Sequence, residues 1–303
     1  MAVQKQIWQN TIIEEFWPDD SFASKATNDS EYVNQGKTVH IPNAGAPSGV
    51  KKNRATLPAE VKVRTDVDVT YDLDEFTTDP VRIPHADTVE LSYSKRNSVI
   101  SQDRNKLRAE AHQSLLEAWA PDTANRISTS GAARTAYLTS ATGQRKAITT
   151  KDVLAVQAKF DLQDVPAADR YLVLDAVMYN DLLADMTESQ KIGFFATANA
   201  KKGIVGELYG FQVMKRSQVL RFTSAGALVK TSEGATLAAS DRAAGLAFQS
   251  EAVSVAMGEV VMFDSVSNPT YYGDIYSFLV RTGGAKRRAD GKGVFAIIEG
   301  TVS

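Results

Sequence analysis

The strongest constraint on the fold of this chain is a strict alternation of side-chain types between residues 61 and 73. The odd positions carry apolar residues or threonine, and the even positions carry charged residues or threonine. Successive side chains of a β-strand point to opposite faces, so this pattern predicts one long strand with one face in water. The predicted strand has thirteen residues, roughly twice the usual length of five or six.

A second strand is predicted just before this one, over residues 37–42, where Val39 and Ile41 alternate with polar residues. Residues 43–58 lie between the two strands and contain glycine, proline and asparagine, which are typical of loops. The segment 37–75 therefore predicts a long β-hairpin, and an isolated two-stranded ribbon is only marginally stable in water. We expect the hairpin to extend beyond one globule and to contact a neighbour. Three basic residues lie near its tip: Lys51, Lys52 and Arg54.

Residues 1–36 have the character of an arm rather than of a domain. Apolar residues recur at helical spacing near its start, and Pro18 ends this helix because the residue before a proline disfavours the helical conformation. The large apolar side chains of the predicted helix are Trp8, Ile12, Phe16 and Trp17. A helix this short is unstable alone in water, so we expect another surface to cover its apolar face.

A long helix is predicted over about residues 88–120, because apolar residues there recur with a helical period and Pro121 ends the pattern. Its apolar stripe consists of Ile100, Leu107, Ala111, Leu115 and Trp119. The following segment, 121–148, is small and polar with few candidates for a core, so it is predicted to be irregular.

A compact α/β unit is predicted from residue 149 onward. Thr149 and Asp175 each precede a segment with helical spacing of apolar residues, as helix-capping residues do. Asp290-Gly291 is a turn signal between the last two strands. A short helix is predicted at 251–257, and strands are predicted at 171–174, 210–214, 244–248, 260–263, 275–281 and 294–298.

Composition excludes several classes of protein. The chain has no cysteine, which excludes disulfides, thiolate zinc sites and a cysteine nucleophile. No window approaches eighteen apolar residues, and the first residues lack the apolar run of a signal peptide, so we expect synthesis in the cytoplasm and no membrane segment. The 34 Lys and Arg against 36 Asp and Glu give a net charge of −2, which argues against general nucleic-acid binding.

Catalytic signatures are also absent from the sequence. It contains no Gly-x-Ser-x-Gly elbow, no His-Glu-x-x-His and no phosphate-binding loop. None of the three histidines, His40, His85 and His112, has a partner at metal-ligand spacing. The carboxylates at 66, 68 and 72 share the outward parity of the predicted strand, and the basic cluster at 286–292 flanks a predicted turn, so both are interpreted as solvated surfaces. We therefore predict no catalytic, cofactor or metal site, and a protein that is not an enzyme.

The order of these elements resembles the major capsid protein of tailed bacteriophages, the Hong Kong 97-type fold. Local segments resemble the family too, and they follow one another in the family's order. Gly36–Pro42 resembles the opening strand of the family's extended loop, and Leu73–Phe76 followed by Val81–Ile83 resembles the segment leading into its spine helix. Arg170–Leu174 with Tyr179–Leu183 resembles the strand-helix pair of its axial domain, and Gly206–Val213 resembles the turn and strand that follow. Arg281–Lys286 is similar to the family's C-terminal end.

The resemblance implies an α+β subunit built from an N-terminal arm, an extended β-hairpin loop, a peripheral domain with a spine helix, and an α/β axial domain. Its implied boundaries are 1–36 for the arm, 37–75 for the hairpin loop, 76–148 with 259–282 for the peripheral domain, and 149–258 with 283–303 for the axial domain. The candidate contacts between subunits are then Trp8, Ile12, Phe16, Trp17, Lys51, Lys52 and Arg54.

The implied function is structural. Hexamers and pentamers of the subunit would form an icosahedral head shell that encloses double-stranded DNA without sequence-specific binding, after assembly in the cytoplasm of the bacterial host. Because the hairpin starts near residue 37, we expect a separate scaffolding protein rather than a cleaved scaffolding segment. A portal protein and decoration proteins are further implied partners. Some members of the family join subunits through a Lys–Asn isopeptide bond, but free basic residues are the favoured interpretation of Lys51 and Lys52.

Two other classes remain open at this point. An encapsulin-type compartment shares the implied fold but packages enzymes instead of a genome, and neighbouring genes for a portal and a terminase would separate the two. Another phage structural protein, from a tail tube or a head decoration, would be mainly β, so a long helix would argue against it.

Overall fold

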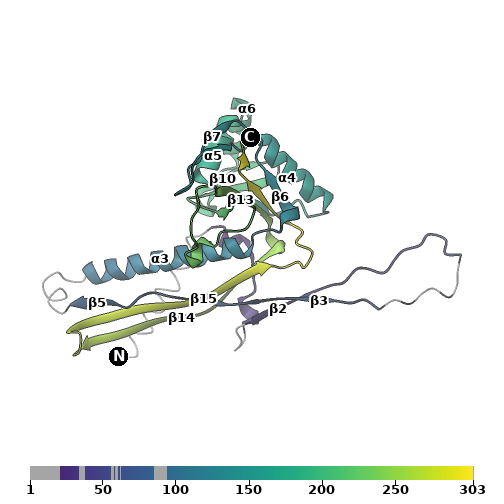
Figure 1. Ribbon diagram of the computed structural model, residues 1–303. Helices are drawn as coiled ribbons and strands as arrows, with labels where there is room; N and C mark the ends of the chain where they lie inside the picture. The colour runs from purple at the N-terminus through teal and green to yellow at the C-terminus, as the bar shows by residue number, and fades with distance from the viewer. Residues whose placement is uncertain are drawn as a thin grey trace.

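The computed structural model describes residues 21–33, 38–55, 58, 61, 63–84 and 94–302. Figure 1 shows an elongated base, in which a long antiparallel ribbon runs beside a long helix, and a compact α/β unit stacked on it. A hairpin with a long loop projects from the base beyond both of these parts. The base and the hairpin therefore both extend beyond the compact α/β unit.

The base is a five-stranded sheet in the order β1-β14-β15-β4, with β5 also paired to β15. Its bulk is the antiparallel ribbon of β14 (Val253–Asn268) and β15 (Gly273–Lys286). Three short strands complete the sheet: β1 (Thr27–Asn28), β4 (Asp74–Thr77) and β5 (Val81–Pro84). The predicted strands at 260–263 and 275–281 are confirmed, and both are longer than expected.

The predicted helix at 251–257 is wrong. Only one turn of 3-10 helix, Ser250–Ala252, occurs there, and β14 begins at Val253. Val253 and Val255 pair with Lys286 and Gly284 of β15 and are buried beneath the compact unit. The partner strand therefore decides the conformation of a segment whose apolar residues alone fit either a helix or a strand.

The long helix α3 (Ser94–Ala118) lies along the ribbon, with its apolar stripe facing the strands as the sequence predicts. Residues 85–93 of the predicted helix lie outside the described residues. Ile100, Leu107 and Ala111 pack against the ribbon in one cluster, together with Met262, Phe278 and Val280. Leu115 and Trp119 belong instead to the cluster beneath the compact unit.

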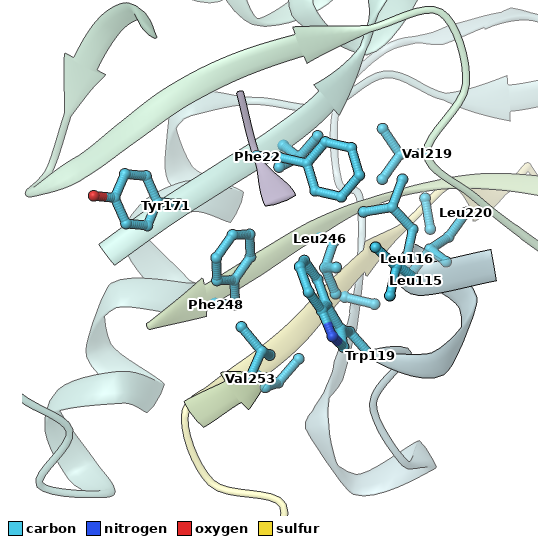
Figure 2. Packing of buried hydrophobic residues seen from close by; sticks show 14 of the residues in the cluster. Phe22, Leu115, Leu116, Trp119, Tyr171, Val219, Leu220, Leu246, Phe248 and Val253 are labelled. Carbon is cyan, nitrogen blue, oxygen red and sulfur yellow. The ribbon is translucent and has the colours of Figure 1, made fainter. Parts of the chain in front are cut away.

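That cluster is held together around Trp119, which is fully buried at the end of α3 (Figure 2). Its indole nitrogen donates a hydrogen bond to the Ser254 carbonyl of β14 at 2.9 Å. Its ring meets Phe22 edge-on and packs against Phe248, with centroid distances of 5.8 and 5.4 Å. Gly284 makes this approach possible, since a Cβ there would lie 3.1 Å from the indole nitrogen and 2.7 Å from the Ser254 carbonyl oxygen.

The compact unit is a seven-stranded sheet in the order β10-β11-β9-β13-β16-β6, with β12 paired to β13. Every residue of its central strand, β9 (Arg170–Asp175), is buried. Tyr171 and Val173 belong to the cluster on the α3 side, whereas Leu172 and Leu174 belong to the cluster on the opposite face. The other strands are β6 (Arg126–Ser128), β10 (Ile204–Leu208), β11 (Phe211–Arg216), β12 (Leu220–Phe222), β13 (Arg242–Gln249) and β16 (Val294–Ile298).

The helices of the unit begin where the sequence predicts. Thr149 forms a capping box with Asp152 at the start of α4 (Thr150–Leu162). Asp175 caps α5 (Ala176–Asp185) by accepting a hydrogen bond from the Met178 amide. A third helix, α6 (Glu188–Ala196), follows directly.

The predicted irregularity of residues 121–148 is wrong. Three short strands form there, because distant parts of the chain supply their partners. β6 pairs in parallel with β16, so it belongs to the sheet of the compact unit, although the sequence placed residues 76–148 with the long helix. A separate three-stranded sheet consists of β7 (Ala133–Thr135), β8 (Gln144–Lys146) and the C-terminal β17 (Gly300–Thr301).

The predicted thirteen-residue strand is also wrong in length. The hairpin ladder joins only β2 (Thr38–Asn43) and β3 (Val67–Asp72), six residues on each side. Val61 and Val63, at the start of the alternation, are 92% exposed. The alternation in the sequence therefore begins before the ladder, whose first residue on this side is Val67.

A buried polar network lies between α5 and the C-terminal strands. The Tyr137 hydroxyl donates a hydrogen bond to Asp175, and Arg134 donates to Asp181 and Glu299. Asp175 and Glu299 are each 1% exposed. Burial raises the pKa of Asp175 from 3.8 to about 6, although the hydrogen bonds from Tyr137 and the Met178 amide oppose this shift.

We expect this network to make the compact unit more stable in mild acid than at neutral pH. Because the folded carboxyl has the higher pKa, the folded state binds more protons, and the free energy of unfolding falls as pH rises from about 4 to about 7. The shift from 3.8 to about 6 corresponds to a loss of at most about 3 kcal/mol. Urea unfolding of unassembled subunits at pH 5 and pH 7 measures it.

Asp175→Asn should reduce this pH dependence, because the neutral amide cannot ionise. The matched control is Asp264→Asn, on the exposed part of β14, which should leave the dependence unchanged. An equal pH dependence in wild type and Asp175→Asn would contradict the prediction.

Candidate functional site

The hairpin loop is mostly exposed in its described residues, and its base is attached to the ribbon by a buried cluster. Val39, Ile41, Tyr71 and Leu73 form a buried cluster with Ala256 of β14. Alternate residues of β2 and β3 thus point into the base, as the sequence pattern predicts for this part of the hairpin. The loop projects from this ladder (Figure 1).

Asn43, at the end of β2, provides a second attachment. Its side-chain nitrogen donates to the Arg287 carbonyl at 2.9 Å, and its side-chain oxygen accepts from the Ala289 amide at 3.3 Å. These two bonds tie the hairpin to the chain that leaves β15. The sequence analysis missed Asn43, because an asparagine before a glycine-rich loop carries only a general turn signal.

The basic cluster at 286–292 lies at this junction, next to the predicted turn, and its charges are paired. Lys286 pairs with Asp122 at 3.0 Å and Arg288 with Asp290 at 2.7 Å. Arg287 lies 3.6 Å from the buried carboxylate of Asp29. The pairs with Asp122 and Asp29 connect the end of β15 to distant parts of the chain, whereas the Arg288–Asp290 pair is local.

Beyond the ladder, Asp66 makes polar contacts with Gly45 and Arg64 that form a narrow neck at the start of the loop. The Asp66 carboxylate accepts a hydrogen bond from the Gly45 amide at 2.8 Å and lies 2.6 Å from Arg64. The hydrogen bond from Arg64, followed by that from Gly45, lowers the pKa of Asp66. The close approach requires glycine, because a Cβ at position 45 would lie 2.0 Å from the Thr65 carbonyl oxygen.

The predicted contact residues of the hairpin, Lys51, Lys52 and Arg54, are exposed in the loop beyond this neck. Within the described residues, none of the three makes a hydrogen bond or ion pair. The adjacent Val50 is 96% exposed. The other predicted contact residues, Trp8, Ile12, Phe16 and Trp17, lie outside the described residues.

A second junction, also missed by the sequence analysis, fastens the compact unit to the long helix. Glu117 of α3 is only 8% exposed, and its carboxylate accepts hydrogen bonds from the Thr231 hydroxyl at 2.8 Å and the Ser232 hydroxyl at 2.5 Å. Thr231 and Ser232 belong to the short helix η5 (Thr231–Glu233). A glutamate on a polar helix carries no sequence signal for such a role.

The described residues contain no group of three or more His, Cys, Asp or Glu side chains arranged to hold a metal ion. His40 is exposed and lies 2.6 Å from Asp68, whereas His112 is buried beside Phe22. His85 lies outside the described residues. None of the helices in the described ranges is both long enough and apolar enough to cross a membrane.

Solved structures share this architecture across almost the whole chain. A chain in the capsid structure of the cyanophage P-SCSP1u matches with a TM-score of 0.64 at 17% identity, covering 92% of this chain and 87% of that one. For the capsid of Ralstonia phage GP4 the TM-score is 0.65 at 13% identity, covering 92% and 88%. For the head structure of the Helicobacter pylori bacteriophage KHP40 it is 0.62 at 12% identity, covering 93% and 90%.

No protein-family model and no curated protein matches the sequence. The similarity therefore lies in the fold, which is α+β and of the Hong Kong 97 type found in phage capsids. The fold predicted from the resemblance is confirmed.

We expect Leu73→Ala to loosen the hairpin without unfolding the compact unit. Leu73 is 1% exposed in the cluster beneath the hairpin, and truncating a buried leucine costs about 2–5 kcal/mol. Amide hydrogen exchange should become faster in β2 and β3 and stay slow in β9. Val63→Ala is the matched control, since that side chain is 92% exposed. Unchanged exchange in β2 and β3 would show that the cluster does not hold the hairpin.

Proposed function

We propose that this chain is the major capsid protein of a tailed bacteriophage, a structural protein and not an enzyme. Its copies would form the hexamers and pentamers of an icosahedral head shell around double-stranded DNA. The observation that carries the proposal is the similarity of fold, over about nine tenths of the chain, to chains in three phage capsids and heads.

The exposed surfaces support the same function. Val50, Val61 and Val63 are each more than 90% exposed on a loop that projects from the subunit. Three almost fully exposed valines on one projecting loop provide apolar surface that a partner can cover. Closed symmetric assembly of identical subunits covers such surfaces without a second kind of protein.

In this proposal the ribbon, α3 and the strands beside them form the peripheral domain, and the compact unit forms the axial domain at the centre of each capsomer. The hairpin loop lies on a neighbouring subunit, with Lys51, Lys52 and Arg54 as contact residues. The arm, residues 1–36, crosses to a neighbour through Trp8, Ile12, Phe16 and Trp17.

The protein would reside in the virion after assembly in the host cytoplasm. A separate scaffolding protein, a portal protein and decoration proteins are the proposed partners besides the protein itself. A net charge of −2 suits a container that holds DNA without sequence-specific binding.

The two alternative classes are less well supported. A tail-tube or decoration protein is disfavoured by the 25-residue helix α3. An encapsulin-type shell would use the same fold, but the similar structures named above are all from bacteriophages.

Electron microscopy of the purified protein in negative stain tests the proposal. We expect closed shells or sheets of hexamers, and monodisperse monomers would contradict it. Co-expression with a scaffolding protein and a portal protein separates the phage head from the encapsulin-type compartment. A head should incorporate the portal at one vertex, whereas a compartment should form without one and retain a co-expressed enzyme.

Removing the hairpin loop should abolish assembly and leave the subunit folded. The ladder ends at Asn43 and Val67, so residues 44–66 can be replaced by Asn-Gly, which favours a two-residue hairpin turn. Thermal unfolding should be nearly unchanged, because none of the loop residues that the structure describes belongs to a buried cluster. Sedimentation should show only unassembled subunits, and normal shells from this variant would contradict the role of the loop.

A further inference from the structure

A cavity of about 520 Å³ lies where the segment that follows α4, the 3-10 turn Ser250–Ala252 and the chain that leaves β15 meet. Its lining includes three cations, Arg287, Arg288 and Lys292, and two carboxylates, Asp164 and Glu251. The cavity therefore joins the compact unit to the end of the ribbon with charged groups on its walls.

Hydrogen bonds between neighbouring segments hold these walls in place. The Arg287 amide donates to the Ala252 carbonyl at 2.8 Å, and the Gln249 amide donates to the Gly293 carbonyl at 3.0 Å. The Gln163 side-chain oxygen accepts from the Gly293 amide at 3.4 Å. The lining is thus arranged before any ligand enters, which lowers the entropic cost of binding.

Two donors of the lining have unused hydrogen-bonding capacity. Gln249 is only 6% exposed, and its side-chain oxygen accepts from the Glu251 amide at 2.8 Å, but its side-chain nitrogen donates to none of the described residues. The Nε atom of Arg287 is buried and likewise has no hydrogen-bond partner among the residues that the structure describes. The other contacts of this guanidinium are long, 3.5 Å to the Thr27 hydroxyl and 3.6 Å to the Asp29 carboxylate. Charge-assisted hydrogen bonds are usually 2.7–2.9 Å long, so both groups can accept a better partner.

Lys292 is a third donor with spare capacity. Its Nζ lies 4.0 Å from the Asp290 carboxylate, which is too far for a hydrogen bond. Arg288 is different, because it donates to the two oxygens of Asp290 at 2.9 and 2.7 Å. The unused groups of the cavity are therefore donors, and the ligand that they fit is an anion with several acceptor oxygens. Phosphate is such an anion, and arginine and lysine both bind it.

The charge around the cavity favours a compact anion over a long polyanion. Asp164 and Glu251 are exposed, and neither makes an ion pair with a described residue. Together with Asp290 they balance the three cations of the lining. A nucleic acid gains affinity mainly by exchanging its counterions for an excess of protein cations, and this surface has no such excess.

We propose that this cavity binds the phosphate group of a small molecule, such as inorganic phosphate or a phosphomonoester. The phosphate oxygens accept hydrogen bonds from the Arg287 guanidinium, the Gln249 side-chain nitrogen and the Lys292 ammonium group. The bound anion then links the compact unit to the segment that leaves β15, to which Asn43 ties the hairpin. The inference goes beyond the proposed function and concerns the single subunit, so its test does not depend on shell formation.

Calorimetric titration of unassembled full-length subunits with sodium phosphate, at constant ionic strength, tests the proposal. We expect saturable binding at one site per subunit. Lys292→Met and Gln249→Glu should each weaken it about tenfold, because each removes one donor to the anion. Gln249→Glu keeps the oxygen that accepts from the Glu251 amide, so it changes the donor and not the turn. Absence of saturable binding to the wild type, or unchanged affinity in both variants, would overturn the proposal.

Two further variants serve as a control and as a test in the opposite direction. Lys201→Met removes an exposed cation of the compact unit outside the cavity lining and should leave the affinity unchanged. Asp164→Asn should tighten binding about threefold, because it removes an exposed like charge beside the anion. Weakening by Lys201→Met as large as that by Lys292→Met would show that only the overall charge matters, and it would overturn the site.

Thermal unfolding provides an independent measurement. Phosphate should raise the Tm of the wild type more than that of Gln249→Glu, because a ligand that binds only the folded state stabilises it. Phosphate also stabilises proteins by exclusion from their surface, and this general effect should be equal in the two proteins. An equal rise in both would therefore overturn the site.

A short DNA duplex is the second probe, because its backbone carries the same phosphate chemistry. We expect the duplex not to displace inorganic phosphate from the cavity. Displacement by the duplex at a lower phosphate concentration, lost in Lys292→Met, would assign the cavity to nucleic acid and overturn its assignment to a small molecule.

Discussion

The architecture depends on the burial of Trp119 where the long helix, the ribbon and the compact sheet meet. Its indole donates to β14, its ring packs on Phe248 of β13, and Phe22 covers it from the N-terminal side. One side chain thereby joins four segments that are far apart in the sequence. The junction also requires glycine at position 284, because a Cβ there would lie 2.7 Å from the Ser254 carbonyl oxygen and 2.9 Å from the Leu115 side chain.

The junction holds two different kinds of structure together. The compact unit has a core on both faces of its sheet, so one subunit can stabilise it. The base has a small buried cluster between α3 and the ribbon and another beneath the hairpin. Glu117 and its hydrogen bonds to Thr231 and Ser232 add a polar fastening between the two parts.

The hairpin places exposed apolar and cationic side chains at a distance from the core. Its ladder is short and anchored by a buried cluster, whereas its loop carries exposed valines and cations that make no ion pair with the residues the structure describes. Val50, Val61 and Val63 are more than 90% exposed, so they contribute little to the stability of a single subunit.

The sequence alone was sufficient to predict the elements that are determined by residues close to one another in the chain. The stripe of α3, the caps at Thr149 and Asp175, and the strand around Tyr171 follow from spacing and capping, which act over a few residues. Partners distant in the chain decided the rest. Val253 became part of a strand because β15 lies beside it, and residues 126–128 became a strand because β16 does. The alternation at 61–73 was visible in the sequence, but only the tertiary structure showed that the ladder with β2 begins at Val67, because pairing requires a second strand within reach.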